Sequence, residues 1–196
     1  DQPINTAGNS WNTSLVTNMY SMFHDASAFN QDISDWNTSS VTNMSYMFWN
    51  SILFDQPINT AGNSWNTSSV TTMIGMFNGA TIFNQDISGW NTALVTTMEF
   101  MFRGAEAFNQ DINTSGDSWN TAAVTNMSQM FDGATAFNGN ISGWNTGNVL
   151  NMHEMFEDAV AFNQDISGWN TAAVTNMSEM FEDAVAFNQD ISGWNT

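Results

Sequence analysis

Eight copies of the triplet Trp-Asn-Thr divide the chain into units of similar length. Their tryptophans are separated by 25 or 29 residues and are Trp11, Trp36, Trp65, Trp90, Trp119, Trp144, Trp169 and Trp194. Self-similarity at this period indicates an array in which each unit packs mainly against its two neighbours. The extra residues of a long unit always enter between an Ile and the next Trp, as between Ile58 and Trp65. An insertion confined to one place predicts a loop on one edge of each coil.

Apolar residues occupy fixed places in every unit. All 14 Met fall in two columns, and nearly all of the 15 Phe fall in two others. The spacing from Val16 through Met19 and Met22 to Ala26 is typical of one face of a short helix. The following segment, Phe29 to Ser34 in one unit, is bounded by turn residues and predicts a short strand. The expected fold class is therefore an α/β repeat solenoid, leucine-rich-repeat-like, with one short parallel strand and one short helix per 25- or 29-residue coil.

The repeats are expected to form a single array over residues 1–196, with seven to eight coils. The sequence begins inside a unit, at Asp1 to Ile4, and it stops just after Trp194. Open ends of a repeat array expose core side chains, so arrays carry polar capping repeats. Neither end has such a repeat, and we therefore expect an uncapped segment of a longer chain.

The charge balance excludes several classes of function. Lys and Arg together contribute 1 residue and Asp and Glu 19, for a net charge of −18, and there is no Cys. Binding to nucleic acid needs several cations for phosphate contacts, so nucleic acid is not an expected partner. No apolar run is long enough for direct membrane insertion.

The chain also lacks the usual ingredients of an active site. His24 and His153 lie in different units and different columns, and neither has a Cys or His partner. No nucleophile and base pair and no metal cluster is expected from them. We therefore expect no enzyme, no catalytic residues and no cofactor, apart from the Ca²⁺ candidates described below.

The repeat has a recognisable pattern, V-T-N-M-S-x-M-F-x-G-A-x-x-F-N-Q-D-I-S-G-W-N-T, which is clearest at Val124 to Thr146 and at Val174 to Thr196. It resembles the bacterial surface-protein repeat of about 26 residues that also occurs in mycoplasma-type lipoproteins and is related to BspA-like leucine-rich repeats. The resemblance covers essentially the whole chain, and the inserted residues of the long units depart from it. It implies a leucine-rich-repeat-like solenoid on an extracellular or cell-surface protein, with adhesion or recognition as its role, and it brings no catalytic residues.

An Asp column near the end of the unit is the candidate for metal binding. Its members are Asp32, Asp86, Asp111, Asp165 and Asp190. Carboxylate oxygens, together with nearby Asn and Gln oxygens, are ligands that Ca²⁺ prefers. The alternative is that each Asp caps a turn and faces solvent. We favour this alternative because Pro3, Pro57 and Asn140 interrupt the column.

The outer face of the expected helices changes character along the chain. Early and middle units carry Tyr46, Trp49, Phe100 and Arg103 there. In the last units the same face is acidic, with Glu154, Glu157, Asp158, Glu179, Glu182 and Asp183. A run of like charges is ordinarily a solvated face. The aromatic part is the candidate surface for contact with a partner.

Two further columns are expected to have structural roles. The Asn after each Trp predicts a hydrogen-bonded ladder between coils, formed by Asn12, Asn37, Asn66, Asn91, Asn120, Asn145, Asn170 and Asn195. The Trp column is expected to pack on itself, with stacking on sugar rings as the alternative.

Two functions remain open on these grounds. The first is a non-enzymatic extracellular scaffold for adhesion or recognition, which binds a protein or glycan on a cell surface. The second is a structural stalk or a self-assembling extracellular filament, built by end-to-end stacking of copies of the chain. Aromatic residues on the outer face favour the first function, and open ends favour the second.

Overall fold

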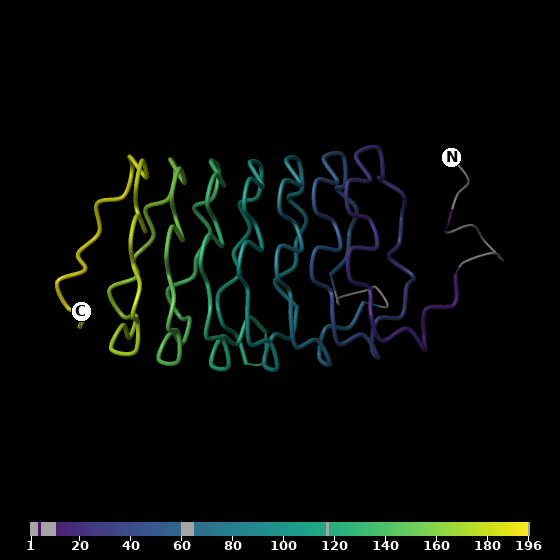
Figure 1. The fold of residues 1–196 in the computed structure, drawn as a ribbon, viewed down its shortest axis with the longest axis horizontal. Helices are drawn as coiled ribbons and strands as arrows, with labels where there is room; N and C mark the ends of the chain where they lie inside the picture. The colour runs from purple at the N-terminus through teal and green to yellow at the C-terminus, as the bar shows by residue number, and fades with distance from the viewer. Residues whose placement is uncertain (1–3, 5–10, 60–64, 117, 196) are drawn as a thin grey trace.

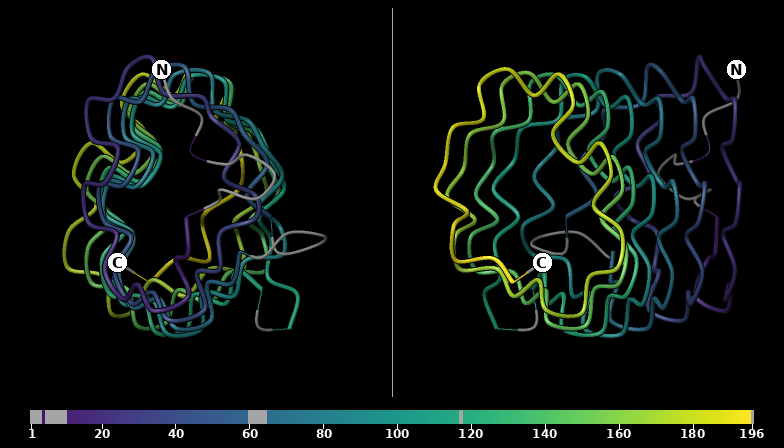
Figure 2. Two further views of the ribbon diagram at one scale, coloured as in Figure 1. Left: turned by 90° about the vertical axis from the view of Figure 1, so that its right-hand side faces the viewer. Right: turned by 60° about the vertical axis from the view of Figure 1, so that its left-hand side comes forward.

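The computed structural model describes residues 4, 11–59, 65–116 and 118–195. The chain winds into coils that follow one another along a single axis (Figure 1). Viewed along that axis, successive coils lie over one another (Figure 2). Parallel bridges join equivalent residues of neighbouring coils, and they run through Asn18, Asn43, Thr72, Thr97, Asn126, Asn151 and Asn176. Each repeat is therefore one turn of a stack, in register with the next.

The predicted α/β solenoid, with its leucine-rich-repeat-like helix and strand in each coil, is wrong. The described part of the chain contains no helix, and its strand pairing is limited to isolated bridges of one residue. The expected helix from Val16 to Ala26 is a series of turns, and the expected strand from Phe29 to Ser34 is irregular backbone that ends in a turn. Within those same described residues, nothing forms a helix that could cross a lipid bilayer.

Residues in the left-handed backbone region prevent the helix. They lie ten and fourteen places after each Trp, as at Tyr46 with φ 58° and Asn50 with φ 52°. The pairs in the seven coils are Ser21 and Asp25, Tyr46 and Asn50, Gly75 and Gly79, Phe100 and Gly104, Gln129 and Gly133, Glu154 and Asp158, and Glu179 and Asp183. A right-handed helix requires negative φ throughout, so two such residues interrupt it in every coil.

Backbone hydrogen bonds along this segment alternate between two directions. Donors to carbonyls of the next coil, at 2.8–3.0 Å, are the amides of Met19, Ser21, Phe23 and Asp25. Donors to the carbonyl three residues back in the same coil, at 3.0–3.2 Å, are the amides of Met22, His24 and Ala26. Successive three-residue turns place an apolar side chain inward about every third residue. This spacing is close to that of a helix face, and it explains why the pattern predicted one.

The core consists of the same side chains repeated in every coil. Met44, Met47 and Phe48 are fully buried, and so are their equivalents in the other inner coils. The Phe48 ring stacks on Phe77 of the next coil with centroids 5.6 Å apart and planes 7° from parallel. The indole of Trp65 is also buried, and its Nε1 donates to the Ile33 carbonyl of the preceding coil at 2.9 Å. Stacked apolar columns therefore fill the interior of the array.

The extra residues of the long units form a loop where the structure describes them. The first and second insertions fall largely on residues 5–10 and 60–64, outside the described residues. In the third insertion, Ser115 and Ser118 exchange two backbone hydrogen bonds of 3.1 Å, and Thr114 Oγ1 donates to the Trp119 carbonyl at 2.8 Å. This teal segment extends outward from the wall of the stack in Figure 2. The insertion leaves the register of the coils on either side unchanged.

Candidate functional site

Some positions of the coil are invariant, and two of the variable positions differ strongly in chemistry from one repeat to the next. The columns of Val16, Met19, Met22, Phe23 and Phe29 hold the same residue type in every described coil. By contrast, the position ten places after Trp is Ser, Tyr, Gly, Phe, Gln, Glu and Glu in successive coils. The position thirteen places after Trp is His, Trp, Asn, Arg, Asp, Glu and Glu. The invariant columns build the stack, so the variable positions are where one coil differs from another in chemistry.

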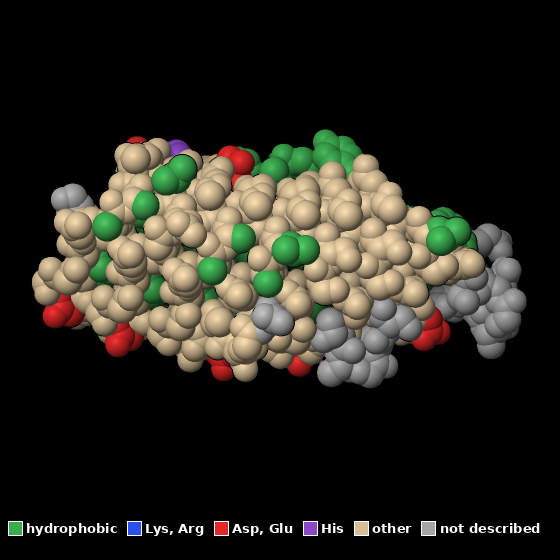
Figure 3. Space-filling model, turned by 90° about the horizontal axis from the view of Figure 1, so that it is seen from below, with side chains coloured by type: hydrophobic (Ala, Val, Ile, Leu, Met, Phe, Trp, Pro, Cys, Tyr) green, Lys and Arg blue, Asp and Glu red, His purple; other side chains and the backbone are tan. Residues whose placement is uncertain are grey.

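We call the positions nine, ten and thirteen places after each Trp the variable ridge. Its residues are Tyr20, Ser21, His24, Ser45, Tyr46, Trp49, Ile74, Gly75, Asn78, Glu99, Phe100, Arg103, Ser128, Gln129, Asp132, His153, Glu154, Glu157, Ser178, Glu179 and Glu182. Because the coils stack in register, these residues form one continuous line along the array. In Figure 3, hydrophobic side chains gather along one edge of the molecule, and acidic side chains with a histidine follow on that edge toward the C-terminal end.

The N-terminal half of the ridge is aromatic. Tyr20 and Tyr46 meet edge to face with ring centroids 5.5 Å apart, and Tyr46 and Trp49 are 5.2 Å apart. His24 stacks on Trp49 at 5.6 Å with planes 3° from parallel. Tyr46 and Trp49 are both partly exposed, and burial is the main reason that the pKa of Tyr46 is raised. These rings form a connected aromatic cluster on the outside of two coils.

Gly75 makes room for this cluster. A Cβ atom at Gly75 would lie 2.7 Å from Tyr46 Cδ1 and 3.2 Å from Trp49 Cε3. Gly75 also has φ +54°, which favours glycine. The third coil therefore provides a bare backbone surface on which the aromatic side chains of the second coil rest.

Arg103 and Asp132 lie between the two halves of the ridge. Arg103 Nε contacts Asp132 Oδ2 at 2.7 Å, and the Asp132 side chain is only 11% exposed. Burial raises the pKa of Asp132 although Arg103 opposes the rise. Arg103 is the single Lys or Arg of the chain. The positive charge of Arg103 therefore neutralises Asp132 of the neighbouring coil, within the ridge.

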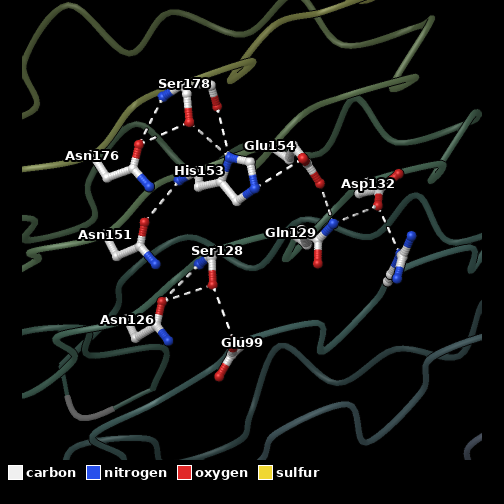
Figure 4. A network of polar contacts seen from close by, with 11 residues as sticks. Glu99, Asn126, Ser128, Gln129, Asp132, Asn151, His153, Glu154, Asn176 and Ser178 are labelled. Carbon is white, nitrogen blue, oxygen red and sulfur yellow. Dashed lines mark hydrogen bonds and ion pairs between the residues drawn. The ribbon is translucent and has the colours of Figure 1, made fainter.

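The C-terminal half of the ridge is a polar network (Figure 4). His153 Nε2 contacts Glu154 Oε1 at 2.8 Å, and His153 Nδ1 lies 2.9 Å from Ser178 Oγ and 3.1 Å from the Ser178 carbonyl. Gln129 donates to both Glu154 and Asp132. Burial raises the pKa of Glu154, but the hydrogen bond from Gln129 and the charge of His153 outweigh it, and the pKa is lowered.

Glu157 has the strongest electrostatic perturbation on the ridge. Its pKa is raised to about 7, first by burial and then by the nearby carboxylates of Asp132, Glu154 and Glu182. Like charges that lie close together disfavour the ionised form. The last coils therefore hold more negative charge at one place than the structure itself neutralises.

Two groups of side chains on this half have the geometry to hold a metal ion. In each group, one ligand atom per residue lies within 4.8 Å of the others: His153, Glu154 and Glu179 in the first, and Asp132, Glu154 and Glu157 in the second. The sequence analysis expected no metal cluster on His153 because it has no nearby Cys or His. It missed the contact with Glu179, which depends on the register between coils, and the repeat length was the only signal of that register.

The predicted Ca²⁺ column lies on exposed turns away from the ridge. Four members accept a hydrogen bond from the amide two residues on, at 2.8–3.0 Å, and these are Asp32, Asp86, Asp165 and Asp190. Asp111 instead accepts from the Asn140 amide of the next coil at 2.8 Å. Hydrogen bonds from Ser167 lower the pKa of Asp165. Four of the five Asp thus serve a turn and Asp111 links two coils, and Ca²⁺ binding by the column stays a prediction.

The Asn column after Trp divides its hydrogen bonds between its own coil and the neighbouring one. In seven coils its Oδ1 accepts a hydrogen bond from the backbone amide two residues on, at 2.9–3.1 Å, as Asn37 does from Ser39. Its backbone carbonyl accepts from the buried Thr of the preceding coil, as Asn37 does from Thr13 at 3.0 Å. The corresponding residues are Asn12, Asn37, Asn66, Asn91, Asn120, Asn145, Asn170 and Asn195.

The sequence analysis missed a second polar column, in which side chains link one coil to the next. Its members are Asn30, Asp55, Asn84, Asn109, Asn138, Asn163 and Asn188. From Asn30 to Asn163, the Oδ1 of each member accepts from the backbone amide of the equivalent residue in the next coil, at 2.8–3.0 Å. The near-constant Phe-Asn dipeptide was the signal that could have identified it.

The Trp column offers little surface to a ligand. The indoles from Trp36 to Trp169 are at most 4% exposed, whereas Trp11 is 52% exposed. Sugar stacking needs an open ring face. Among the tryptophans of this column, Trp11 alone is an exposed large hydrophobic residue in the described part of the chain.

Comparison with known proteins gives one family. The model described as "Mycoplasma protein of unknown function, DUF285" matches three consecutive stretches, residues 1–62, 59–115 and 113–196. No curated protein and no solved structure matches the chain. The matched stretches cover the chain from end to end, and each contains more than one coil.

Proposed function

The chain belongs to the DUF285 family of tandem repeats, and from this premise we propose that it is a non-enzymatic recognition scaffold whose variable ridge contacts a partner. The partner is a protein or a glycan at the cell surface, and the scaffold works outside the cell. The acidic composition without Cys supports this proposal.

A single observation carries the proposal: the repeats vary on the ridge while the core columns stay constant. A position that served only the stack would repeat in every coil, as the buried Met and Phe do. The ridge instead carries Tyr46, Phe100, Gln129 and Glu154 at the same place in successive coils.

The backbone at this place strengthens the argument. The four residues just named have positive φ between 53° and 59°. Side chains with a Cβ pay roughly 1–2 kcal/mol in this region, whereas glycine does not. Gly75 occupies the same place with φ 54°, so the stack accepts glycine there. Bulky side chains held at a cost, on the outside of the molecule, support a role in contacts with another molecule.

The test compares ridge and non-ridge substitutions of similar size and polarity. The ridge variant combines Tyr46→Ser, Trp49→Ser and Phe100→Ser. The matched control combines Leu15→Ser, Leu94→Ser and Leu150→Ser, because these residues are 89%, 54% and 49% exposed and lie off the ridge. Fluorescently labelled proteins are applied to arrays of glycans and extracellular protein domains and to cultured cells.

We expect binding of the wild-type chain that the ridge variant loses and the control retains. Circular dichroism and hydrodynamic size verify that both variants keep the fold. Equal binding by the ridge variant and the control would refute the proposal, and so would wild-type binding that neither change affects.

One observation favours end-to-end assembly as a second candidate function. Every described junction between coils uses the same four backbone donors, as when the amides of Met44, Tyr46, Phe48 and Asn50 donate to carbonyls of the following coil. Because each coil presents the same donors on one side and the same acceptors on the other, a coil of one copy can pair with a coil of another copy in the same way.

Sedimentation velocity over a wide range of protein concentration tests this second function. End-to-end stacking predicts a sedimentation coefficient that increases with concentration and a series of elongated oligomers. The substitution Met177→Pro removes one of these donors from the coil of Trp169 and is expected to reduce the association. A monomer at all concentrations would exclude the filament.

A further inference from the structure

The two halves of the variable ridge share one property, which is attraction for cations. Aromatic ring faces attract Lys and Arg side chains within about 6 Å of the ring centre. The N-terminal half presents such rings at Tyr20, Tyr46 and Trp49, which contact one another and remain partly or fully exposed. The aromatic and the acidic half, which lie on either side of the Arg103–Asp132 ion pair, therefore suit the same kind of ligand.

The carboxylates of the C-terminal half lack enough cations of their own. Among the described residues, Arg103 is paired with Asp132 at 2.7 Å and His153 with Glu154 at 2.8 Å. Glu157 and Glu182 form no ion pair in the described chain. Burial is the largest cause of the raised pKa of Glu157, and the neighbouring carboxylates are the next. These carboxylates therefore lie close to Glu157. A ligand that brings positive charge would remove this repulsion.

We propose that the variable ridge binds an extended, Arg- or Lys-rich segment of a partner protein. The segment places cationic side chains over Tyr46 and Trp49 at one end and against Glu157, Glu179 and Glu182 at the other. This inference rests on the proposed recognition function, and it narrows the partner from any surface molecule to a polycationic polypeptide.

The length of the segment follows from the geometry of the stack. Trp49 lies in the coil of Trp36 and Glu182 in the coil of Trp169, which are five coil steps apart. Neighbouring backbones that share hydrogen bonds are about 4.8 Å apart, so the ridge between these residues measures about 24 Å. An extended chain rises about 3.3 Å per residue. A segment of about seven residues therefore spans the ridge.

The experiment measures the affinity of a fluorescent octa-arginine peptide by anisotropy at physiological ionic strength. A chain this acidic attracts cations in general, so the variants must separate the ridge from net charge. The ridge variant combines Glu157→Gln, Glu179→Gln and Glu182→Gln. The control combines Asp86→Asn, Asp165→Asn and Asp190→Asn, which removes the same number of carboxylates from exposed turns off the ridge. Asn is compatible with those turns, because Asn140 caps its own turn at the same column.

We expect the ridge variant to bind about tenfold more weakly, as three lost ion pairs imply, and the control to change less than about twofold. Trp49→Leu, which keeps apolar bulk but removes the ring, is expected to weaken binding about threefold through loss of the cation–π contact. Melting curves establish that each variant is folded at the assay temperature.

Equal weakening by the two triple variants would mean general charge attraction and would overturn the proposal. The absence of measurable octa-arginine binding to the wild-type chain would overturn it as well. In either case, array or cell binding that still requires Tyr46, Trp49 and Phe100 would leave the recognition function in place and reject only the polycationic class. Loss of that requirement would reject the recognition function itself.

Discussion

Phe100 and Phe102 are two residues apart in the same coil, yet they belong to different parts of the molecule. Phe102 is fully buried and stacks on Phe77 and Phe131 of the adjacent coils at 5.6 Å. Phe100 has φ 59°, is partly exposed, and stands where other coils have Gly, Gln or Glu. Packing between the coils therefore requires Phe102, whereas it does not determine the residue at the position of Phe100. The predictions below test that division.

The largest effect is expected at the buried member of the pair. Phe102→Ala removes a ring that contacts three coils, and it leaves a cavity that the stacked rings cannot fill by moving together. Truncation of a buried Phe costs about 3–5 kcal/mol in unfolding free energy. Chemical denaturation measures this loss, and a loss below that of an ordinary surface substitution would contradict the assignment of Phe102 to the core.

A smaller loss is expected at the glycine beneath the aromatic cluster. Gly75→Ala introduces a Cβ in the left-handed region, 2.7 Å from Tyr46 Cδ1, and is expected to cost about 1–2 kcal/mol or more. Gly116→Ala is the matched control, since φ is +64° there and nothing lies within 4 Å of the new atom. The difference between the two unfolding free energies isolates the contact with Tyr46. Equal losses would mean that the cluster does not depend on the bare backbone of the third coil.

Substitution of Phe100, the exposed member of the pair, is expected to increase the unfolding free energy rather than lower it. Phe100→Gly relieves a positive φ on a side chain that adds little to the core, so we expect a gain of about 0.5–1 kcal/mol in unfolding free energy. The same denaturation experiment measures it. A marked loss of unfolding free energy would show that Phe100 has a structural role. The variation of residues along the ridge would then not indicate contact with a partner.

The smallest effect is expected at Glu157 and depends on pH. Its pKa is about 7 when folded against an ordinary value of 4.5, so the folded state holds the proton more strongly between these pH values. The contribution of Glu157 therefore lowers stability as pH rises from 4.5 to about 7, and the penalty is complete above 7. Glu157→Gln removes it.

The variant is thus expected to gain stability relative to the wild-type chain as pH rises through this window, by about 1 kcal/mol or less after solvent screening. Thermal melts at a series of pH values record the difference. A difference that stays constant between pH 4.5 and pH 8 would contradict crowding of the carboxylates around Glu157.

The sequence predicted the array and its buried columns, but it did not predict the backbone. Met44, Met47 and Phe48 repeat without change, and repetition of large apolar residues is sufficient to identify a core. Their spacing suits both a helix and a series of three-residue turns, so spacing alone could not distinguish the two. Gly75, Gly79 and Gly104 occupy the positions of positive φ in some coils, but Tyr46 and Phe100 occupy them in others, and such residues rarely adopt positive φ.

The candidate site was predictable in part for the same reason. Tyr46, Trp49, Phe100 and Arg103 were chosen from the sequence because they depart from the repeat, and the structure places them on one ridge. The contacts of Gln129 with Glu154 and of Arg103 with Asp132 join neighbouring coils, so they depend on how far one coil is shifted over the next. A single sequence does not contain that shift, so these contacts could not be derived from it.

The hydrogen bonds between coils have a consequence for the electric field of the array. At each described junction, four amides of the segment that bears the ridge donate to the following coil, as those of Met19, Ser21, Phe23 and Asp25 do, whereas amides elsewhere in the coil, such as that of Thr42, donate to the preceding one. Along this segment the peptide dipoles add parallel to the stacking axis, as they do along a helix. The variable ridge therefore lies on a wall of aligned dipoles, and a charged side chain placed there interacts with backbone dipoles as well as with its neighbours.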